Sequence, residues 1–175
     1  TAYGSTTFAT FALGSDSQAN LTVRIYSIAD GREMAATYFY PGTNEYLKSP
    51  RIIYDSTNNQ YGLFWINMNT AGNLHSVQGG TIPATGASDS ITTAGELINM
   101  DGVTAVTPAM DVAIYEGQGY AVAAWDPAGG GVGHIRLRLF TLGLSPPAAT
   151  ASLVPTVAPG SLTAHVTYSA PNLTG

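Results

Sequence analysis

Three histidines, His75, His134 and His165, are the first residues to consider for metal binding or proton transfer. Zinc sites commonly place their ligands at short fixed spacings such as H-x-H or H-E-x-x-H, and neither spacing occurs in this chain. His75 and His134 instead occupy matching places in two similar stretches, which favours a structural role within strands. The sequence therefore predicts no metal site and no cofactor.

Four carboxylates, Asp55, Asp111, Glu116 and Asp126, lie near the ends of expected strands or in the turns between them. A pair of such groups could hydrolyse a glycosidic bond or bind calcium. Turn aspartates more often bond to their own backbone, and no D-x-D-x-D-G loop is present. The G-x-S-x-G elbow of serine hydrolases is also missing. We therefore predict no catalytic residue and a protein that is not an enzyme.

Aromatic residues offer a different chemistry, because their flat rings can stack on the apolar C–H faces of sugars. Trp65, Trp125, Tyr61 and Tyr120 are the candidate ligand-binding residues of this kind. The alternative is that these rings are simply core, since buried aromatic side chains dominate the packing of small domains. Their apolar neighbours favour the core, and a glycan remains a candidate ligand.

The charge composition excludes some classes of binding partner. The chain has 175 residues, a net charge of −5, six Lys and Arg in total and no cysteine. Nucleic acid and anionic membranes attract clustered cations, so neither is an expected partner. No apolar run reaches the roughly 20 residues of a membrane helix. A charged fraction of only 10%, against a usual quarter, favours an extracellular or cell-surface protein with a neutral, hydroxyl-rich surface.

Two N-glycosylation sequons occur, at Asn20 and Asn172. They would be used only in a host that glycosylates its secreted proteins. Thr1 opens a strand-like stretch and is not an initiator Met, so we expect a processed chain or a fragment.

The elements that must position these residues are expected to be short strands. Period-two alternation is clear after Asn20, where Leu21, Val23 and Ile25 share one face of a half-buried strand. Residues 79–90, with Gly79-Gly80 and Pro83, are expected to form a loop. The strongest strand patterns cover residues 6–13, 21–28, 61–68, 111–115, 120–125 and 134–142.

An internal repeat organises these strands. Trp65 and Trp125 are 60 positions apart, and Phe11 precedes Trp65 by 54. Arg24 and Arg138, each followed two residues later by an aromatic residue, are 114 apart, or two such periods. A period of about 55 to 60 residues with several strands per unit is typical of stacked β units. One small sheet cannot bury its own apolar face, so it stacks on copies of itself.

The repeated pattern runs from an apolar strand ending in tyrosine, through a polar turn, to a strand with tryptophan, a glycine-rich turn and an R-x-aromatic strand. It resembles the divergent β-propeller repeats of extracellular bacterial proteins, similar to sialidase-like and lectin-like propellers. The resemblance covers residues 1–145 in about two and a half units. Two features depart from it: the units are too few to close a propeller, and the S-x-D-x-G-x-T-W box of sialidases is absent.

The end of the chain differs in composition. Residues 145–160 contain Pro146, Pro147, Pro155 and Pro159 and no charge, as in a linker or extended arm. Residues 161–175 begin with one more alternating strand, in which Leu162, Ala164, Val166 and Tyr168 share a face. That strand could complete the sheet of a neighbouring chain, or it could pack back on its own domain, residues 1–144.

Together these patterns predict an all-β antiparallel fold, a propeller-like repeat array, with a β-sandwich as the alternative. The first function hypothesis is a non-catalytic extracellular structural protein, such as a surface or filament subunit or a viral shell component. It would work as a homo-oligomer or polymer. The second is a carbohydrate-binding propeller lectin, and the third is a fragment of a glycosidase-type propeller.

Overall fold

The computed structural model of the chain describes residues 1–14, 20–42, 45–69, 74–86, 91–100, 109–115, 119–126, 134–140 and 151–153. All regular elements in these residues are β-strands, and they form three antiparallel sheets. The predicted all-β antiparallel class is therefore confirmed. None of the described residues forms a helix long and apolar enough to cross a lipid bilayer.

Sheet 1 is formed by the first four strands in chain order. Their bounds are β1 (Ala2–Tyr3), β2 (Thr7–Leu13), β3 (Leu21–Ser27) and β4 (Glu33–Phe39). The alternation predicted for β3 is confirmed, because Leu21, Val23 and Ile25 are fully buried while Thr22 and Arg24 are only partly covered. A strand with one buried face follows directly from this period of two.

Sheet 2 is formed by the next four strands. Their bounds are β5 (Glu45–Asp55), β6 (Gln60–Asn69), β7 (Leu74–Pro83) and β8 (Thr92–Met100). The loop expected at residues 79–90 is wrong in its first part, because β7 continues through Gly79-Gly80 to Pro83. A Cβ at Gly79 would lie 2.9 Å from atoms of Phe64 and Leu97. The glycines therefore belong to a strand whose neighbours take the space of their missing side chains.

Sheet 3 completes the series. Its strands are β9 (Met110–Tyr115), β10 (Gly119–Asp126), β11 (His134–Phe140) and β12 (Ala151–Leu153). The short strand β12 pairs with β11 through Leu137 and Ala151 at one end and Ile135 and Leu153 at the other. The stretch expected as a linker or arm, residues 145–160, thus contributes an edge strand to this sheet.

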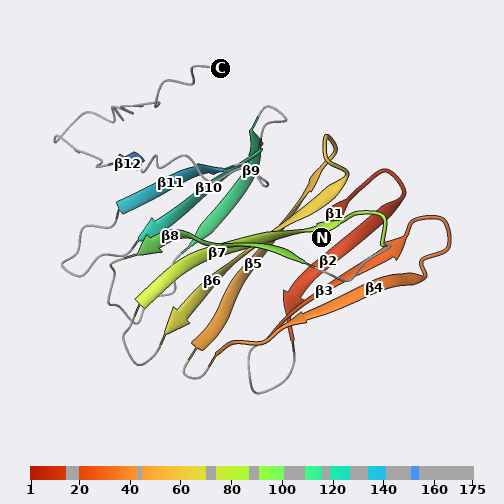
Figure 1. Ribbon diagram of the computed structural model, residues 1–175, viewed down its shortest axis with the longest axis horizontal. Helices are drawn as coiled ribbons and strands as arrows, with labels where there is room; N and C mark the ends of the chain where they lie inside the picture. The colour runs from red at the N-terminus through yellow and green to blue at the C-terminus, as the bar shows by residue number, and fades with distance from the viewer. Residues whose placement is uncertain are drawn as a thin grey trace, which may run out of the picture.

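The three sheets share one topology. In each, the four strands follow one another in chain order, and each neighbouring pair is antiparallel. Figure 1 shows the sheets arranged in chain order, with sheet 2 between sheets 1 and 3. Phe11, Trp65 and Trp125 all lie in the second strand of their sheets, namely β2, β6 and β10.

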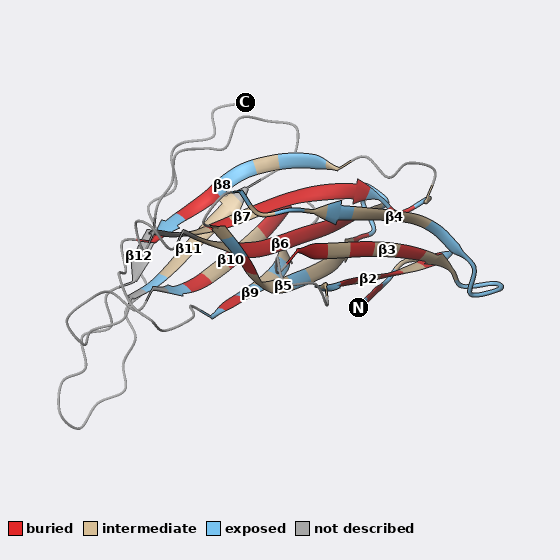
Figure 2. Cartoon of the chain, turned by 90° about the horizontal axis from the view of Figure 1, so that it is seen from below, coloured by how far each residue is buried: buried red, intermediate tan, exposed pale blue. Residues whose placement is uncertain are grey.

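The core consists of two layers of side chains, one on each side of sheet 2. Strand β6 contributes to both: Leu63 and Trp65 pack with sheet 1 in one layer, and Phe64 and Ile66 pack with sheet 3 in the other. Figure 2 shows β6 as buried, whereas much of β4 and β8 is exposed. Sheet 2 is therefore covered on both faces, and sheets 1 and 3 each have one face turned away from it.

Candidate functional site

The contact between sheets 1 and 2 is fixed by the hydroxyl of Tyr61, near the start of β6. This hydroxyl donates a hydrogen bond to the backbone carbonyl of Thr7 at 2.8 Å. The Thr7 hydroxyl in turn donates to the carbonyl of Ala84 at 2.6 Å. Tyr61 is fully buried, and this burial raises the pKa of its hydroxyl, although the hydrogen bond with Thr7 acts in the opposite direction.

A matching tyrosine fixes the contact between sheets 2 and 3. Tyr120, near the start of β10, donates from its hydroxyl to Oδ2 of Asp55 at 3.1 Å. Nε2 of Gln60 donates to the same Oδ2 at 3.3 Å and to the Tyr120 hydroxyl at 3.2 Å. Each tyrosine thus reaches from the second strand of its own sheet to the end of a strand in the preceding sheet.

Asp55 is the buried charge of this contact, with only 3% of its surface exposed. It also accepts hydrogen bonds from the backbone and side-chain nitrogens of Asn58 at 3.2 and 2.8 Å. Burial alone would raise the pKa of Asp55, but the donors Asn58, Tyr120 and Gln60 outweigh it and lower that pKa. Burial and the nearby charge of Asp55 raise the pKa of Tyr120. This carboxylate is therefore a structural anion that ties β5 to β10.

The face of sheet 3 that points away from sheet 2 is open and, apart from Asp111 of β9, apolar. Trp125 in β10 pairs with Ile135 in β11, and these side chains are 39% and 46% exposed. Beside them, Ala121 and Ala123 pair with Leu139 and Leu137. We call this surface the open face of sheet 3; its residues are Asp111, Ala113, Ala121, Ala123, Trp125, Ile135, Leu137 and Leu139.

The face of sheet 1 that points away from sheet 2 carries a row of aromatic rings. The Phe8 ring stacks on Tyr26 with centroids 4.9 Å apart, and Tyr3 lies 5.9 Å from Phe8 on its other side. Tyr3 is 70% exposed. We call this surface the open face of sheet 1; its residues are Tyr3, Phe8, Thr10, Ala12, Thr22, Arg24, Tyr26, Glu33, Ala36 and Tyr38.

The candidate ligand-binding aromatics divide into two groups. Trp65, Tyr61 and Tyr120 are enclosed between sheets, and the Trp65 ring lies against Phe39 with centroids 4.8 Å apart. A ligand could reach these three rings only if the sheets separated. Trp125 is the one member of the set that lies on an open face.

The two tryptophans do not occupy equivalent positions, although they are 60 residues apart. Trp65 lies four residues after Tyr61, whereas Trp125 lies five residues after Tyr120. Successive side chains of a strand point to opposite faces, so Trp65 faces the preceding sheet and Trp125 faces away from it. Ile66 is the true counterpart of Trp125. The buried tyrosines, rather than the tryptophans, mark the register of the repeat.

The remaining predicted site residues fall in several environments. Asn20 is only 5% exposed, and an amide buried to this extent cannot carry a glycan without leaving its position. Asp111 is exposed and lies 3.9 Å from Nε of Arg51. Among the described residues, no three His, Asp or Glu side chains group as they would around a metal ion.

Several predictions fall on residues or side chains outside the described part of the chain. These are the side chains of His75, His134 and Asp126, and the residues Glu116, His165, Leu162, Ala164, Val166, Tyr168 and Asn172. The expected strand at residues 161–175 and the second sequon therefore stay predictions.

Comparison of the chain with protein-family models, with curated proteins and with solved structures found no match. The function therefore has to be inferred from the geometry of the chain itself. That geometry offers two directional contacts between sheets and two open faces at opposite ends of the series.

Proposed function

We propose that this chain is a non-catalytic structural protein that acts by self-association. Its three sheets would form a propeller-like array, and the open face of sheet 3 in one copy would stack on the open face of sheet 1 in the next. The observation that carries the proposal is that sheet 2 has both faces buried, while sheet 3 presents an open, largely apolar face and sheet 1 an open face with a row of aromatic rings.

The stacking of sheet 2 supports an array over the β-sandwich alternative. A sandwich of two sheets buries only the two inner faces, whereas β6 contributes Trp65 to one core layer and Phe64 to the other. Small sheets that stack in series in this way can be extended by further sheets at either end. This stacking of small sheets in series also supports the resemblance to propeller repeats.

The two open faces suit one another in shape. The open face of sheet 3 carries the small residues Ala121 and Ala123 beside Trp125, whereas the open face of sheet 1 carries the bulky rings of Phe8 and Tyr26. Large side chains that fit against small ones give the close packing that stable interfaces need. Exposed apolar surface of this kind commonly marks a protein interaction site.

Contact between two different faces is heterologous, so it would generate a ring if the rotation closes and a filament if it does not. The low charged fraction of 10% supports placing this assembly outside the cell or on its surface, because few charges oppose close contact between copies. The proposed activity needs no cofactor and no catalytic group.

The test is the solution mass of the protein by light scattering, with negative-stain imaging, over a range of concentrations. We expect the unmodified chain to form rings or filaments as its concentration rises. Trp125→Glu should weaken association at least tenfold, because it places a charge in the centre of the contact. Ile28→Ser is the matched control, because Ile28 is an exposed apolar residue in the turn between β3 and β4.

A monomer at every concentration would overturn the proposal, as would assembly that Trp125→Glu leaves unchanged. A monomer would favour the second candidate function, glycan binding. The observation behind this candidate is the row of Tyr3, which is exposed, and the half-buried Phe8 and Tyr26. This row lies on the same face as the polar side chains of Thr10 and Arg24. Binding on a glycan array that is lost in Tyr3→Ala would then identify that face as a lectin site.

A further inference from the structure

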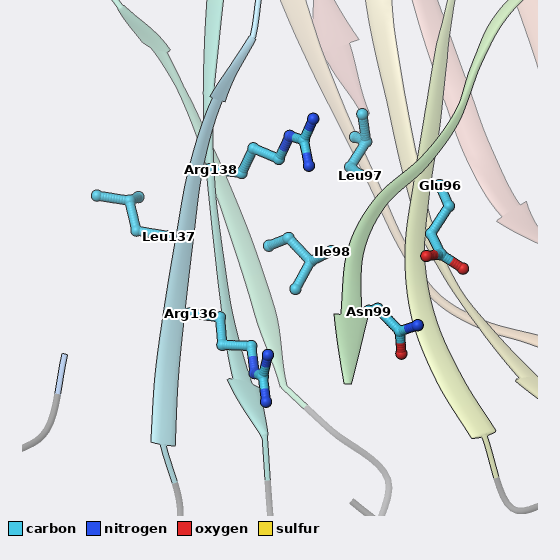
Figure 3. Close-up of a pocket in the computed structure, with 7 residues that line it drawn as sticks. All are labelled: Glu96, Leu97, Ile98, Asn99, Arg136, Leu137 and Arg138. Carbon is cyan, nitrogen blue, oxygen red and sulfur yellow. The ribbon is translucent and has the colours of Figure 1, made fainter. Parts of the chain in front are cut away.

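A cleft of about 180 Å³ lies between the edge strand of sheet 2 and β11 of sheet 3. Leu97 and Ile98 of β8 form one wall, and Arg136 and Arg138 of β11 line the other. Figure 3 shows both guanidinium groups turned from β11 toward β8, whereas Leu137 between them points the opposite way. Two cations therefore project into one narrow space between the sheets.

The alternation of side chains along β11 explains why both arginines reach the cleft, because they are two residues apart and so lie on the same face. Arg136 and Arg138 pair with Ala124 and Val122 of β10, which are buried in the layer between sheets 2 and 3. The arginine side chains lie on this same inner side, at the rim of the apolar layer. Long arginine stems commonly cover apolar surface in this way while their charged heads remain near solvent.

Arg138 has an unsatisfied donor in this place. Its Nε is buried, and no described residue accepts a hydrogen bond from it. A guanidinium carries only donors, so an acceptor must supply the missing bond, and buried polar atoms without a partner are uncommon in native proteins. The nearby carboxylate of Glu96 does not fill this role, because Figure 3 shows it turned to the far side of β8.

Ion pairs elsewhere in the described part of this acidic chain lie at exposed side chains. They join Arg24 to Glu33, Arg32 to Asp30 and Arg51 to Asp111. We propose that the cleft between β8 and β11 binds a small oxyanion group, a carboxylate or a phosphate, through Arg138 with Arg136 beside it. Planar guanidinium groups match the oxygens of both anions with paired hydrogen bonds.

The size of the cleft limits the ligand. At about 30 Å³ for each water of the liquid, 180 Å³ corresponds to roughly six water molecules. A phosphate ion or a carboxylate of a few carbon atoms therefore fits, and a long polyanion could place only one such group there. The arginine side chains lie on the inner side of sheet 3, opposite to its open face, so the inference does not depend on the proposed self-association.

The experiment titrates the full chain with sodium phosphate and, separately, with sodium acetate, at constant ionic strength set with sodium chloride. Thermal melting and isothermal titration calorimetry report binding, because a ligand that binds only the folded state raises the melting temperature. We expect saturable binding of at least one anion, and the two series distinguish a phosphoryl from a carboxyl ligand. Arg138→Gln should raise the Kd at least tenfold.

Arg32→Gln is the matched control, because it also removes one arginine charge but from an exposed residue in the turn before β4. It should bind like the unmodified chain. Equal losses in both variants would show a general charge effect and would overturn the proposal, as would no saturable binding of either anion. Should Arg138→Gln fail to fold, the test uses Arg136→Gln instead, which should also weaken anion binding. Phosphorus NMR line broadening with the unmodified chain then reports whether phosphate binds.

Discussion

Tyr120 and Asp55 show how single residues hold two sheets in register. The Tyr120 hydroxyl and the Asp55 carboxylate lie 65 positions apart in the chain and 3.1 Å apart in space. Gln60 bonds to both, so the three side chains form one hydrogen-bonded group at the contact between sheets 2 and 3. Removing one member takes a hydrogen bond from the others, although Asp55 keeps those from Asn58.

Tyr120→Phe tests this group directly. The change keeps the ring and removes the hydroxyl, so Asp55 loses a donor while buried. We expect the free energy of unfolding to fall by about 1.5 to 3 kcal/mol, the usual range for a hydrogen bond to a charged group. Urea denaturation followed by circular dichroism measures it. Tyr38→Phe, at an exposed tyrosine of sheet 1, should change stability by less than about 0.5 kcal/mol; equal effects would contradict the assigned role.

The lowered pKa of Asp55 predicts a dependence of stability on pH. Because its pKa is lower in the folded chain than the unfolded value of about 3.9, its contribution is fully present above that unfolded value. The contribution is lost as the pH falls through the folded pKa. Urea unfolding between pH 6 and 2.5 should show this loss, and Asp55→Asn should reduce it.

Asp111→Asn is the control for this pH series, because the Asp111 side chain is 89% exposed. It should leave the acid-induced loss of stability as in the unmodified chain. An unchanged pH profile in Asp55→Asn would show that other carboxylates carry the acid sensitivity.

At the scale of elements, the pairing of β7 with β8 depends on residues without side chains. A Cβ at Gly80 would lie 2.7 Å from the backbone carbonyl oxygen of Thr92. Backbone cannot move aside as the end of a flexible side chain can, so the two strands approach this closely only because Gly80 is a glycine. The pairing also shifts register between Gly79 and Gly80.

Gly80→Ala should therefore destabilise the fold by about 1 to 3 kcal/mol, the usual range for overpacking. Thr93→Ala, at an exposed position of β8 opposite Gly80, is the control and should cost less than about 0.5 kcal/mol. Urea denaturation of both variants measures the free energy of unfolding. A Gly80→Ala protein as stable as the control would show that β8 can move away from the added Cβ at little cost.

At the scale of the whole molecule, sheet 2 is the part that the rest of the chain covers. Its strand β6 has neighbours on both edges, β5 and β7, and a packed layer on both faces. Strand β4 is an edge strand of sheet 1 and has several exposed side chains. Regions with few buried contacts open first, whereas a doubly covered strand opens only when much of the fold opens.

Hydrogen exchange measured by mass spectrometry should therefore find the slowest amides in β6. Peptides from β4 should exchange much faster under the same conditions. The comparison is internal to one sample, so it needs no variant. If β6 exchanged as fast as β4, sheets 1 and 3 would not be holding sheet 2 as the structure indicates.

The sequence alone determined the class of fold and most of the strands, because local alternation is enough to specify a half-buried strand. Leu21, Val23 and Ile25 are the clearest case, with each predicted side chain fully buried. The series of similar units was also visible, since tyrosines and tryptophans recur at long intervals. The expected loop at Gly79-Gly80 failed because glycine is a local signal for turns, whereas here it accommodates neighbouring strands.

Which side chains face a neighbouring sheet and which face solvent follows from the stacking of the three sheets, which local sequence does not specify. Trp65 and Trp125 look equivalent in the sequence, yet a difference of one residue relative to Tyr61 and Tyr120 places them on opposite faces. The roles of Asp55 and of the cleft at Arg138 likewise depend on contacts between residues far apart in the chain. A side-chain period of two specifies alternation within a strand, but the stacking of whole sheets decides which alternate set is buried.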